Sequence, residues 1–395
     1  MFRRAFLGTA TGVLLAASMA ALPATAGAGQ GHNTAGGPFQ QLLAAEHTAG
    51  MPGLFAEIRD GNRVWRGAAG VADVDTSRPV RPWFQHRVGS ITKTFVATTV
   101  LQLQAEGRLR LDTPIGAYLP DVVPGTLGRQ VSVRMLLNHT SGIGDYPGAI
   151  LRTVDDLESV RRRTFAPREL VEIGLSLPAT NPPGASYAYS NTNYIIAGLL
   201  IERITHHPYA TDVDRRILRP LGLTGTYFPG TETRIRRAHA KAYVPAADAT
   251  LRDFSVYNMS WGWAAGEMVS TPHDINRFYQ ALLSGQLLPP AQLAEMQTTV
   301  PSPDDPTAGY GLGLSYVRLP CGPAWGHLGG VIGHGTFTFH RADGSRHVTL
   351  AENLTFPVGT SQPPAISQAR IEFIVTALCG TDATAKANDA DPSHP

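Results

Sequence analysis

A serine and a lysine three positions apart, Ser90 and Lys93, are the first residues whose types and spacing could do chemistry. Residues three apart on a helix share a face, so a helix through this stretch would hold the amine beside the hydroxyl. A serine hydroxyl is a poor nucleophile until a neighbour takes its proton, and lysine can do so only when burial keeps it neutral. A helix N-terminus would also stabilise a tetrahedral oxyanion. The same two residues could instead be a capping serine and a solvated lysine, so further residues must decide.

The stretch that follows Ser90 is expected to be the helix that positions both groups. A stripe with three- and four-residue spacing runs along it, made of Phe95, Val96, Thr99, Val100 and Leu103. Gly107 is suited to end the helix as a C-terminal cap. The sequence therefore predicts a largely buried helix with Ser90 at its N-terminal end.

Two more short motifs carry polar side chains that could belong to the same site. Tyr189-Ser190-Asn191 follows a Pro-Gly break and precedes a periodic helix, and His327-Leu328-Gly329-Gly330 lies on a predicted strand. Each has an ordinary structural explanation when taken alone. Tyr189 could be a half-buried core tyrosine, Asn191 a helix N-cap, and His327 a hydrogen-bonded strand histidine.

Strands are predicted near both ends of the chain and helices in its middle. Apolar or alternating segments predict strands at residues 54–59, 63–69, 310–316, 324–328, 335–340 and 347–352. Periodic segments predict helices at residues 39–47, 168–177, 192–205, 272–283 and 366–378. The expected fold class is α+β: an antiparallel sheet flanked by N- and C-terminal helices, with a mainly helical region on the other side.

The first 26 residues are typical of a signal peptide. Arg3 and Arg4 precede an apolar segment rich in small residues, and the arginine pair also fits a twin-arginine export signal. We expect a flexible spacer at residues 27–37, one large domain at 38–380 with a helical insertion at about 113–265, and a disordered tail at 381–395. The predicted location is secreted, without a membrane span once the signal is removed.

Composition narrows the class of protein. The chain has 395 residues, of which 43% are hydrophobic and 16% charged, as in an ordinary globular protein. It has 33 basic and 31 acidic residues, and the basic residues are not clustered in the sequence, which argues against a nucleic-acid partner. Cys321 and Cys379 are the only cysteines, and an oxidising exterior favours a bridge, with two buried free thiols as the alternative.

No metal or other cofactor is predicted. The chain has 13 histidines, but it lacks the His-Glu-x-x-His and Cys-x-x-Cys patterns. His206 and His207 are adjacent rather than one helical turn apart, so they are not spaced as ligands on one helix face.

Taken in order, the three motifs resemble those of the active-serine penicillin-recognising enzymes. They are similar to class C β-lactamases and, more closely, to secreted D-alanyl-D-alanine carboxypeptidases. The resemblance covers residues 39–379, and it includes His139-Thr140-Ser141-Gly142, Ser260-Trp261, Ala265-Gly266 and Tyr310-Gly311-Leu312-Gly313-Leu314. It implies a β-lactamase/transpeptidase-like fold, and the two cysteines look like the carboxypeptidase's disulfide pair.

This resemblance implies roles for five residues. Ser90 would be the nucleophile that forms an acyl-enzyme. A neutral Lys93 would accept its proton directly or through Tyr189, which would then deliver a proton to the leaving group. Asn191 would orient Lys93 and bind the acyl-side amide of the substrate. His327 would tune the charge near Tyr189.

It also implies how a substrate would be held. The backbone N–H groups of Ser90 and Gly330 would form the oxyanion hole. Trp261, Gly329 and Leu328 would line the substrate site.

The third motif departs from the family at the residues that hold a substrate carboxylate. Relatives carry hydroxyl side chains where this chain has Leu328 and Gly330, and the carboxypeptidase has an arginine where this chain has Ser315. Arg318 is a candidate replacement, although strand alternation does not decide which face it occupies. A carboxylate without these partners would bind weakly, because burying an unpaired charge costs several kcal/mol.

The sequence therefore predicts a secreted serine hydrolase of carboxypeptidase type acting on cell-wall peptides. The alternatives are an esterase or D-amino-acid peptidase or amidase on the same scaffold, a class C-like β-lactamase, and a non-catalytic penicillin-binding receptor. The expected partner is a small peptide, ester or β-lactam substrate. The sequence leaves the oligomeric state open.

Overall fold

The computed structural model describes residues 37–303, 305–356 and 362–380. The expected signal segment, nearly all of the spacer and the C-terminal tail lie outside these ranges. Within them, no helix is long and apolar enough to cross a membrane.

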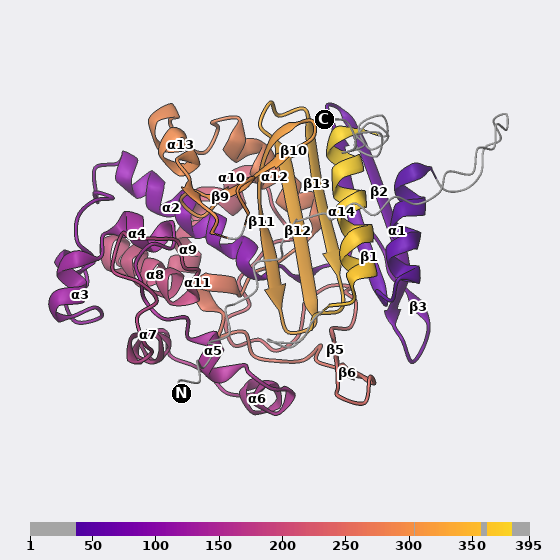
Figure 1. Ribbon diagram of the computed structural model, residues 1–395, viewed down its shortest axis with the longest axis horizontal. Coiled ribbons are helices and arrows are strands. Elements are labelled where there is room, and N and C mark those ends of the chain that lie inside the picture. Colours follow the sequence, from indigo (N-terminus) through magenta and orange to yellow (C-terminus); the bar gives the residue numbers. More distant parts are fainter. Residues whose placement is uncertain (1–36, 304, 357–361, 381–395) are drawn as a thin grey trace, which may run out of the picture.

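One antiparallel sheet of nine strands forms the centre of the molecule, in the order β3-β2-β1-β13-β12-β11-β10-β9-β8 (Figure 1). The strands are β1 Gly53–Asp60, β2 Arg63–Asp73, β3 Arg78–Pro79, β8 Val300–Pro301, β9 Ala308–Tyr310, β10 Ser315–Leu319, β11 Gly322–Val331, β12 His334–Arg341 and β13 Arg346–Glu352. The N-terminal hairpin pairs with the C-terminal strands through β1 and β13, with Leu54 opposite Glu352. The two ends of the chain therefore build one sheet, as the sequence predicts.

Two terminal helices cover one face of this sheet. α1 Pro38–Thr48 packs against α14 Pro364–Cys379, and both lie on the side of the sheet that faces the viewer in Figure 1. A disulfide joins Cys321, just before β11, to Cys379 at the end of α14. The predicted pairing of the two cysteines is therefore present.

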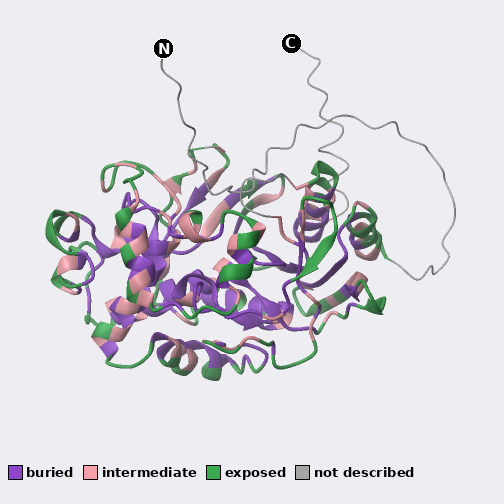
Figure 2. Ribbon diagram, turned by 90° about the horizontal axis from the view of Figure 1, so that it is seen from below, coloured by how far each residue is buried: buried purple, intermediate pink, exposed green. Residues whose placement is uncertain are grey.

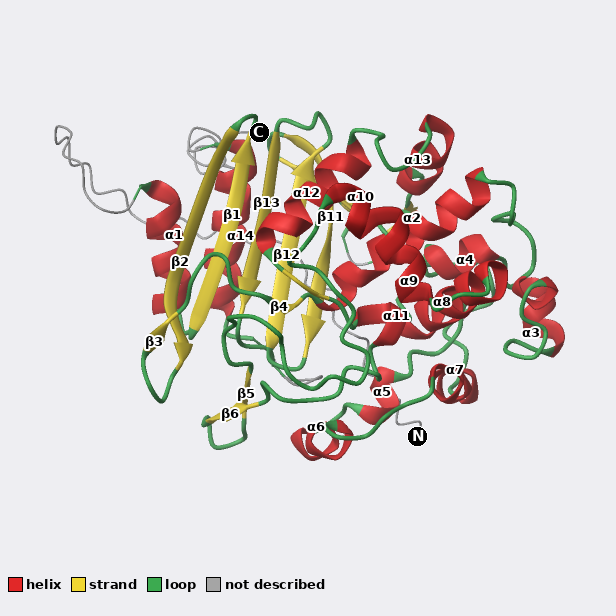
Figure 3. Cartoon of the chain, turned by 180° about the vertical axis from the view of Figure 1, so that it is seen from behind, coloured by secondary structure: helices red, strands yellow, loops and turns green. Residues whose placement is uncertain are grey.

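The other face and one side of the sheet carry the helical region (Figure 3). α12 Pro272–Leu283 crosses this face and contacts β1, β12 and β13. The other helices are α2 Thr92–Ala105, α3 Gly125–Gln130, α4 Val133–Leu137, α5 Pro147–Ile150, α6 Val154–Val160, α7 Pro167–Ser176, α8 Asn191–Thr205, α9 Tyr209–Val213, α10 Arg219–Leu221, α11 Trp263–Gly266 and α13 Pro290–Gln297. Short 3₁₀ turns η1 Gly89–Ile91 and η2 Ile115–Ala117, a π turn η3 Asp214–Leu218, and the two-stranded pairs β4 His86–Arg87 with β7 Val269–Ser270 and β5 Tyr243–Pro245 with β6 Leu251–Asp253 complete this region.

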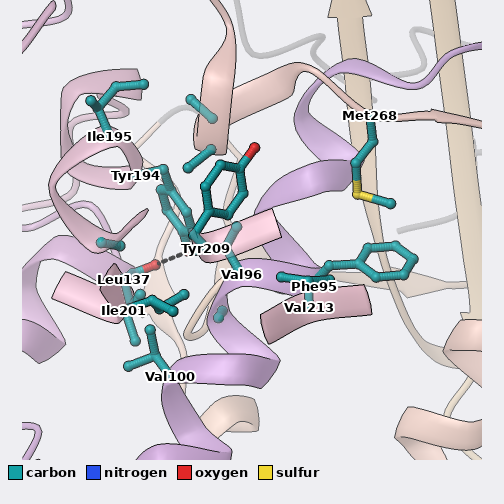
Figure 4. Close-up of a cluster of buried hydrophobic side chains, with 14 of the residues drawn as sticks. Phe95, Val96, Val100, Leu137, Tyr194, Ile195, Ile201, Tyr209, Val213 and Met268 are labelled. Carbon is teal, nitrogen blue, oxygen red and sulfur yellow. Dashed lines mark hydrogen bonds between the residues drawn. The ribbon is translucent and has the colours of Figure 1, made fainter. Parts of the chain in front are cut away.

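Helix α2 lies at the centre of the main hydrophobic core. Its residues are buried on almost every side rather than along one stripe, and Figure 2 shows buried ribbon through the middle of the molecule. Phe95 stacks on Phe278 of α12, and Val96 and Val100 lie among side chains of α4, α8 and α9 (Figure 4). The dashed line in that view joins the Tyr194 hydroxyl to the Leu137 carbonyl. Gly107 follows the helix with a φ of +72°, and it ends α2 as predicted.

The strand predicted over residues 310–316 is wrong, because the chain turns inside it. β9 ends at Tyr310 and β10 begins at Ser315, with Gly313 between them at a φ of +73°. The Gly313 carbonyl accepts a hydrogen bond from Thr94 Oγ1 at 2.7 Å, and a Cβ on Gly313 would lie 2.5 Å from that of Ala97. The glycine therefore lets this turn approach α2, which strand periodicity does not reveal.

Candidate active site

The end of η1 and the first turn of α2 place Ser90 beside Lys93. The amine nitrogen of Lys93 lies 2.9 Å from Ser90 Oγ, and the lysine side chain is fully buried. The amine also donates to Asn191 Oδ1 and to the Ala265 carbonyl, both at 2.7 Å. A neutral amine has two hydrogens and one lone pair. Since both other partners are pure acceptors, the lone pair of a neutral Lys93 faces the Ser90 hydroxyl.

The surroundings of Lys93 favour this neutral form. Burial lowers the pKa of Lys93 to about 7, and the carboxylate of Asp145 acts in the opposite direction. The neutral amine is therefore well populated near pH 7, as a general base for a serine requires.

Asp145 fixes the orientation of Asn191 at the start of α8. Its Oδ1 accepts hydrogen bonds from the Asn191 backbone N–H at 2.7 Å and from Asn191 Nδ2 at 3.0 Å. Because the amide nitrogen points to this carboxylate, the amide oxygen must point to Lys93. Asp145 thus acts on Lys93 through Asn191 as well as through its charge.

Tyr189 completes the group around Ser90. Its hydroxyl hydrogen-bonds Ser90, and burial raises the pKa of the phenol well above its usual value, with that hydrogen bond acting in the opposite direction. The ring packs on the imidazole of His139, with centroids 4.2 Å apart. His139 Nδ1 accepts a hydrogen bond from the Ser190 backbone N–H at 3.1 Å, which holds the loop that carries Tyr189. Tyr189 is therefore a protonated phenol within hydrogen-bonding distance of the Ser90 hydroxyl.

Glycines bring strand β11 against η1. Gly89 has a φ of +56°, and a Cβ there would lie 2.7 Å from the backbone nitrogen of Gly330. A Cβ on Gly329 would lie 2.0 Å from the Val88 carbonyl oxygen. The backbone of Gly330 therefore lies directly beside the turn that carries Ser90.

His327 lies in the site, but not as a charged neighbour of Tyr189. Its Nε2 accepts a hydrogen bond from the Tyr310 hydroxyl at 2.7 Å, and its Nδ1 donates to the Leu328 carbonyl. Burial first and then the charge of Lys93 lower the pKa of His327 to about 3. The imidazole is neutral at physiological pH and is hydrogen-bonded to Tyr310, and its expected tuning of charge near Tyr189 stays a prediction.

Two of the predicted substrate-binding side chains pack in the hydrophobic cores, and their contact with a substrate stays a prediction. Trp261 is only 6% exposed and packs in the main core, with its carbonyl accepting from the Tyr146 hydroxyl. Leu328 packs in the second core, where it lines an apolar cavity beneath α14 with Phe337. These side chains therefore belong to the two cores. Gly329 contributes the close approach to η1 described above.

The proposed replacement for the missing carboxylate anchor is also misplaced. In the register of β10 and β11, Ser315 lies opposite Gly326, whereas Arg318 lies opposite Pro323. Pro323 is four residues from His327, which is about 13 Å along a strand. Arg318 is thus at the far end of the hairpin from the histidine, and it cannot replace the family's arginine.

Three contributors to the site were not among the residues singled out from the sequence for a function. Asp145 lies in a loop without a motif, whereas Ala265, which contributes its carbonyl, and His139 were noted only as parts of the resemblance. No cluster of three metal-ligating side chains occurs among residues 37–303, 305–356 and 362–380.

Comparisons with known proteins fit this geometry. A D-stereospecific amidohydrolase from Streptomyces sp. has a solved structure that is 40% identical, with a TM-score of 0.78 over 87% of this chain and 98% of that one. A D-amino acid amidase from Ochrobactrum anthropi SV3, solved with L-phenylalanine, is 28% identical, with a TM-score of 0.77 over 86% and 97% of the two chains. Among curated proteins, esterase EstB from Burkholderia gladioli is 32% identical over 201 residues, which is 49% of this chain and only 50% of that esterase.

The family assignment rests on a longer match. The model of the Beta-lactamase family matches residues 39–370, which contain all three motifs and nearly the whole described domain. The fold and the serine–lysine pair are those of a serine hydrolase. The chain therefore belongs to the β-lactamase family.

Proposed function

We propose that the protein cleaves amide or ester bonds of D-amino-acid derivatives through an acyl-enzyme on Ser90. Ser90 Oγ attacks the substrate carbonyl carbon while its proton passes to Lys93. The bond from that carbon to the leaving nitrogen or oxygen breaks, and the leaving group departs with a proton delivered through Tyr189. Water then attacks the acyl carbon, and Ser90 recovers its proton as the free acid leaves.

The oxyanion of each tetrahedral intermediate binds the backbone N–H groups of Ser90 and Gly330 in this proposal. The contact between Gly89 and the Gly330 nitrogen supports it, because it holds the two amides on neighbouring backbone segments. Preorganised donors of this kind typically contribute about 10²- to 10³-fold to the rate.

The observation that carries the substrate class is the lack of a carboxylate anchor on β10 and β11. In these two strands, Leu328 faces the core beneath α14, Gly330 has no side chain, and Arg318 lies at the far end. The neutral His327 supplies no positive charge either. A C-terminal D-Ala-D-Ala carboxylate would lack an ionic partner there, whereas an amide or ester needs none. The 40% identity to the D-stereospecific amidohydrolase supports the same choice.

An exported enzyme is part of the proposal. Arg3 and Arg4 before an apolar segment support a signal peptide, and the bridge between Cys321 and Cys379 supports an oxidising compartment. Measuring the mass of the protein in the medium and in the cell would test it. Retention of the full-length chain in the cytoplasm would contradict export.

One set of assays separates the candidate activities. Residues 27–395 and the matched variant Ser90→Ala are incubated with D- and L-phenylalanine amide, a D-Ala-D-Ala peptide, a p-nitrophenyl ester and a fluorescent penicillin. We expect Ser90-dependent turnover of the ester and of the D-amide. Preferential cleavage of the D-Ala-D-Ala peptide would favour the carboxypeptidase, and penicillin hydrolysis would favour a β-lactamase. Stable penicillin labelling without turnover of any substrate would indicate a receptor.

An esterase is the second candidate, and the match to esterase EstB favours it. Ser90-dependent ester hydrolysis without cleavage of either phenylalanine amide would select it. The same result would reject the amidase.

A further inference from the structure

Only one of the two carboxylate oxygens of Asp145 accepts hydrogen bonds from the described chain. Oδ1 accepts both hydrogen bonds from Asn191. Oδ2 makes no hydrogen bond within the described chain, and it is not among that chain's buried polar atoms without a partner. Asp145 as a residue is partly exposed, while burial of its carboxyl raises the pKa and the hydrogen bonds from Asn191 act in the opposite direction. Beside Asn191 there is therefore a carboxylate oxygen without a hydrogen-bond partner in the described chain.

A chain of three hydrogen bonds links Asp145 to the Ser90 hydroxyl. Asn191 Nδ2 is 3.0 Å from Asp145 Oδ1, Asn191 Oδ1 is 2.7 Å from the Lys93 amine, and that amine is 2.9 Å from Ser90 Oγ. These contacts place the carboxylate on the side of Asn191 that faces away from Lys93. A substrate carbonyl held at Ser90 therefore has Asp145 on the flank formed by the start of α8.

When Lys93 is neutral, as catalysis requires, the negative charge of Asp145 has no positive charge beside it in the described part of the chain. When Lys93 is neutral, the positive charge nearest to Asp145 is gone. Burial lowers the pKa of both His139 and His327, so neither imidazole replaces that charge at neutral pH. A partly buried anion without a counter-charge is unfavourable, and an incoming cation would relieve it. The site is therefore electrostatically suited to a positively charged substrate.

We propose that Asp145 binds the free α-ammonium group of the substrate's acyl part, so that the enzyme selects amides, esters and short peptides with an unblocked N-terminal amino acid. This inference rests on the function proposed above and adds a residue that determines the substrate specificity of that function. The α-nitrogen of an amino acid is two bonds from the carbonyl carbon that Ser90 attacks. The same carboxylate repels a substrate carboxylate on this flank.

The test compares two substrates that differ only in the amino group. kcat/KM is measured for D-phenylalanine p-nitroanilide and its N-acetyl derivative with the unaltered protein, Asp145→Asn and Asp155→Asn. Asparagine keeps an oxygen that can accept from Asn191, but it removes the charge. Asp155 is exposed on α6, so its replacement is a matched control for the loss of one negative charge. Because both substrates use Lys93, the ratio of the two values cancels any change in its pKa.

We expect the unaltered protein and Asp155→Asn to prefer the free amine, and Asp145→Asn to lose this preference by about 10- to 100-fold. An equal loss for both substrates would show that Asp145 only supports the structure, and it would overturn the proposal. A preference of the unaltered protein for the acetylated substrate would also overturn the proposal. This comparison does not depend on whether any variant folds. If neither anilide is cleaved while a p-nitrophenyl ester is, the proposed function itself fails, and this inference fails with it.

Discussion

The pH dependence of acylation follows directly from the burial of Lys93. The pKa of this lysine is lowered to about 7 because its charged form is desolvated. Since only the neutral amine can take the proton of Ser90, kcat/KM must rise as pH increases through 7 and then level off. A lysine with its ordinary pKa near 10.4 would instead give a rate that keeps rising past pH 9.

The expected size of the change can be worked out. With a pKa of about 7, the neutral fraction is about one eleventh at pH 6 and about ten elevenths at pH 8, so kcat/KM rises about tenfold. An ordinary lysine would give about a hundredfold rise over the same interval. His327, with its pKa lowered to about 3, and Tyr189, with its pKa raised, do not titrate in this range.

The assay is hydrolysis of a neutral p-nitrophenyl ester from pH 5 to pH 10, with the rate of Ser90→Ala subtracted at each pH. Replacing Asp145 by asparagine removes a negative charge that favours the ammonium form of Lys93, so the inflection should move to lower pH. Tryptophan fluorescence at each pH shows whether the fold persists. A log-linear rise beyond pH 9, or an inflection that moves upward in Asp145→Asn, would refute the assignment of Lys93 as the base.

Three further changes test the surrounding structure. Gly89→Ala should lower kcat by about 10²-fold, because its Cβ meets the Gly330 nitrogen at 2.7 Å; Gly107→Ala, which also has a positive φ but open space, should keep its activity. Tyr189→Phe should lower amide turnover by about 10²- to 10⁴-fold but hydrolysis of a p-nitrophenyl ester far less, since that leaving group needs no proton; equal losses would contradict a role as proton donor. Cys321→Ser opens a bridge between residues 58 apart, and it should lower the free energy of unfolding in urea by about 4 kcal/mol. An unchanged urea midpoint would contradict the last expectation.

The parts of the fold with a strong periodic signal could be predicted from sequence. The hairpin at Asp60-Gly61 and helices α2, α8 and α14 follow from residue spacing and from turn and cap residues. The turn at Gly313 could not be predicted, because its neighbours have the residue pattern of a strand and the need for a glycine arises only from the contact with α2. Local periodicity reports which residues prefer a strand, but not where a tertiary contact forces the chain to turn.

The candidate site divides in the same way. Ser90, Lys93 and Tyr189 lie in motifs whose residue types suggest their chemistry, and the structure brings them together. Asp145 lies in no such motif, and the Ala265-Gly266 segment is part of the resemblance but its residue types suggest no chemistry. The first is reached only because the loop before α5 folds back onto α8, and the second acts through a backbone carbonyl that any residue could supply. Such contributions depend on tertiary contacts and leave no mark in the residue type.

The two candidate bases can be separated by the cost of forming each reactive state. At pH 7 about half of the Lys93 side chains are already neutral, because burial lowers the pKa of the amine to about 7. Burial has the opposite effect on Tyr189: it raises the pKa of the phenol well above its usual value near 10, so its anion is populated by less than about one molecule in a thousand. The hydrogens of a neutral Lys93 are taken by Asn191 and Ala265, so its lone pair has only the Ser90 hydroxyl to accept from. The same low polarity thus leaves the lysine free to take a proton and keeps the tyrosine protonated, so Tyr189 acts as a base less readily than Lys93 and holds a proton that a relay to the leaving group can use.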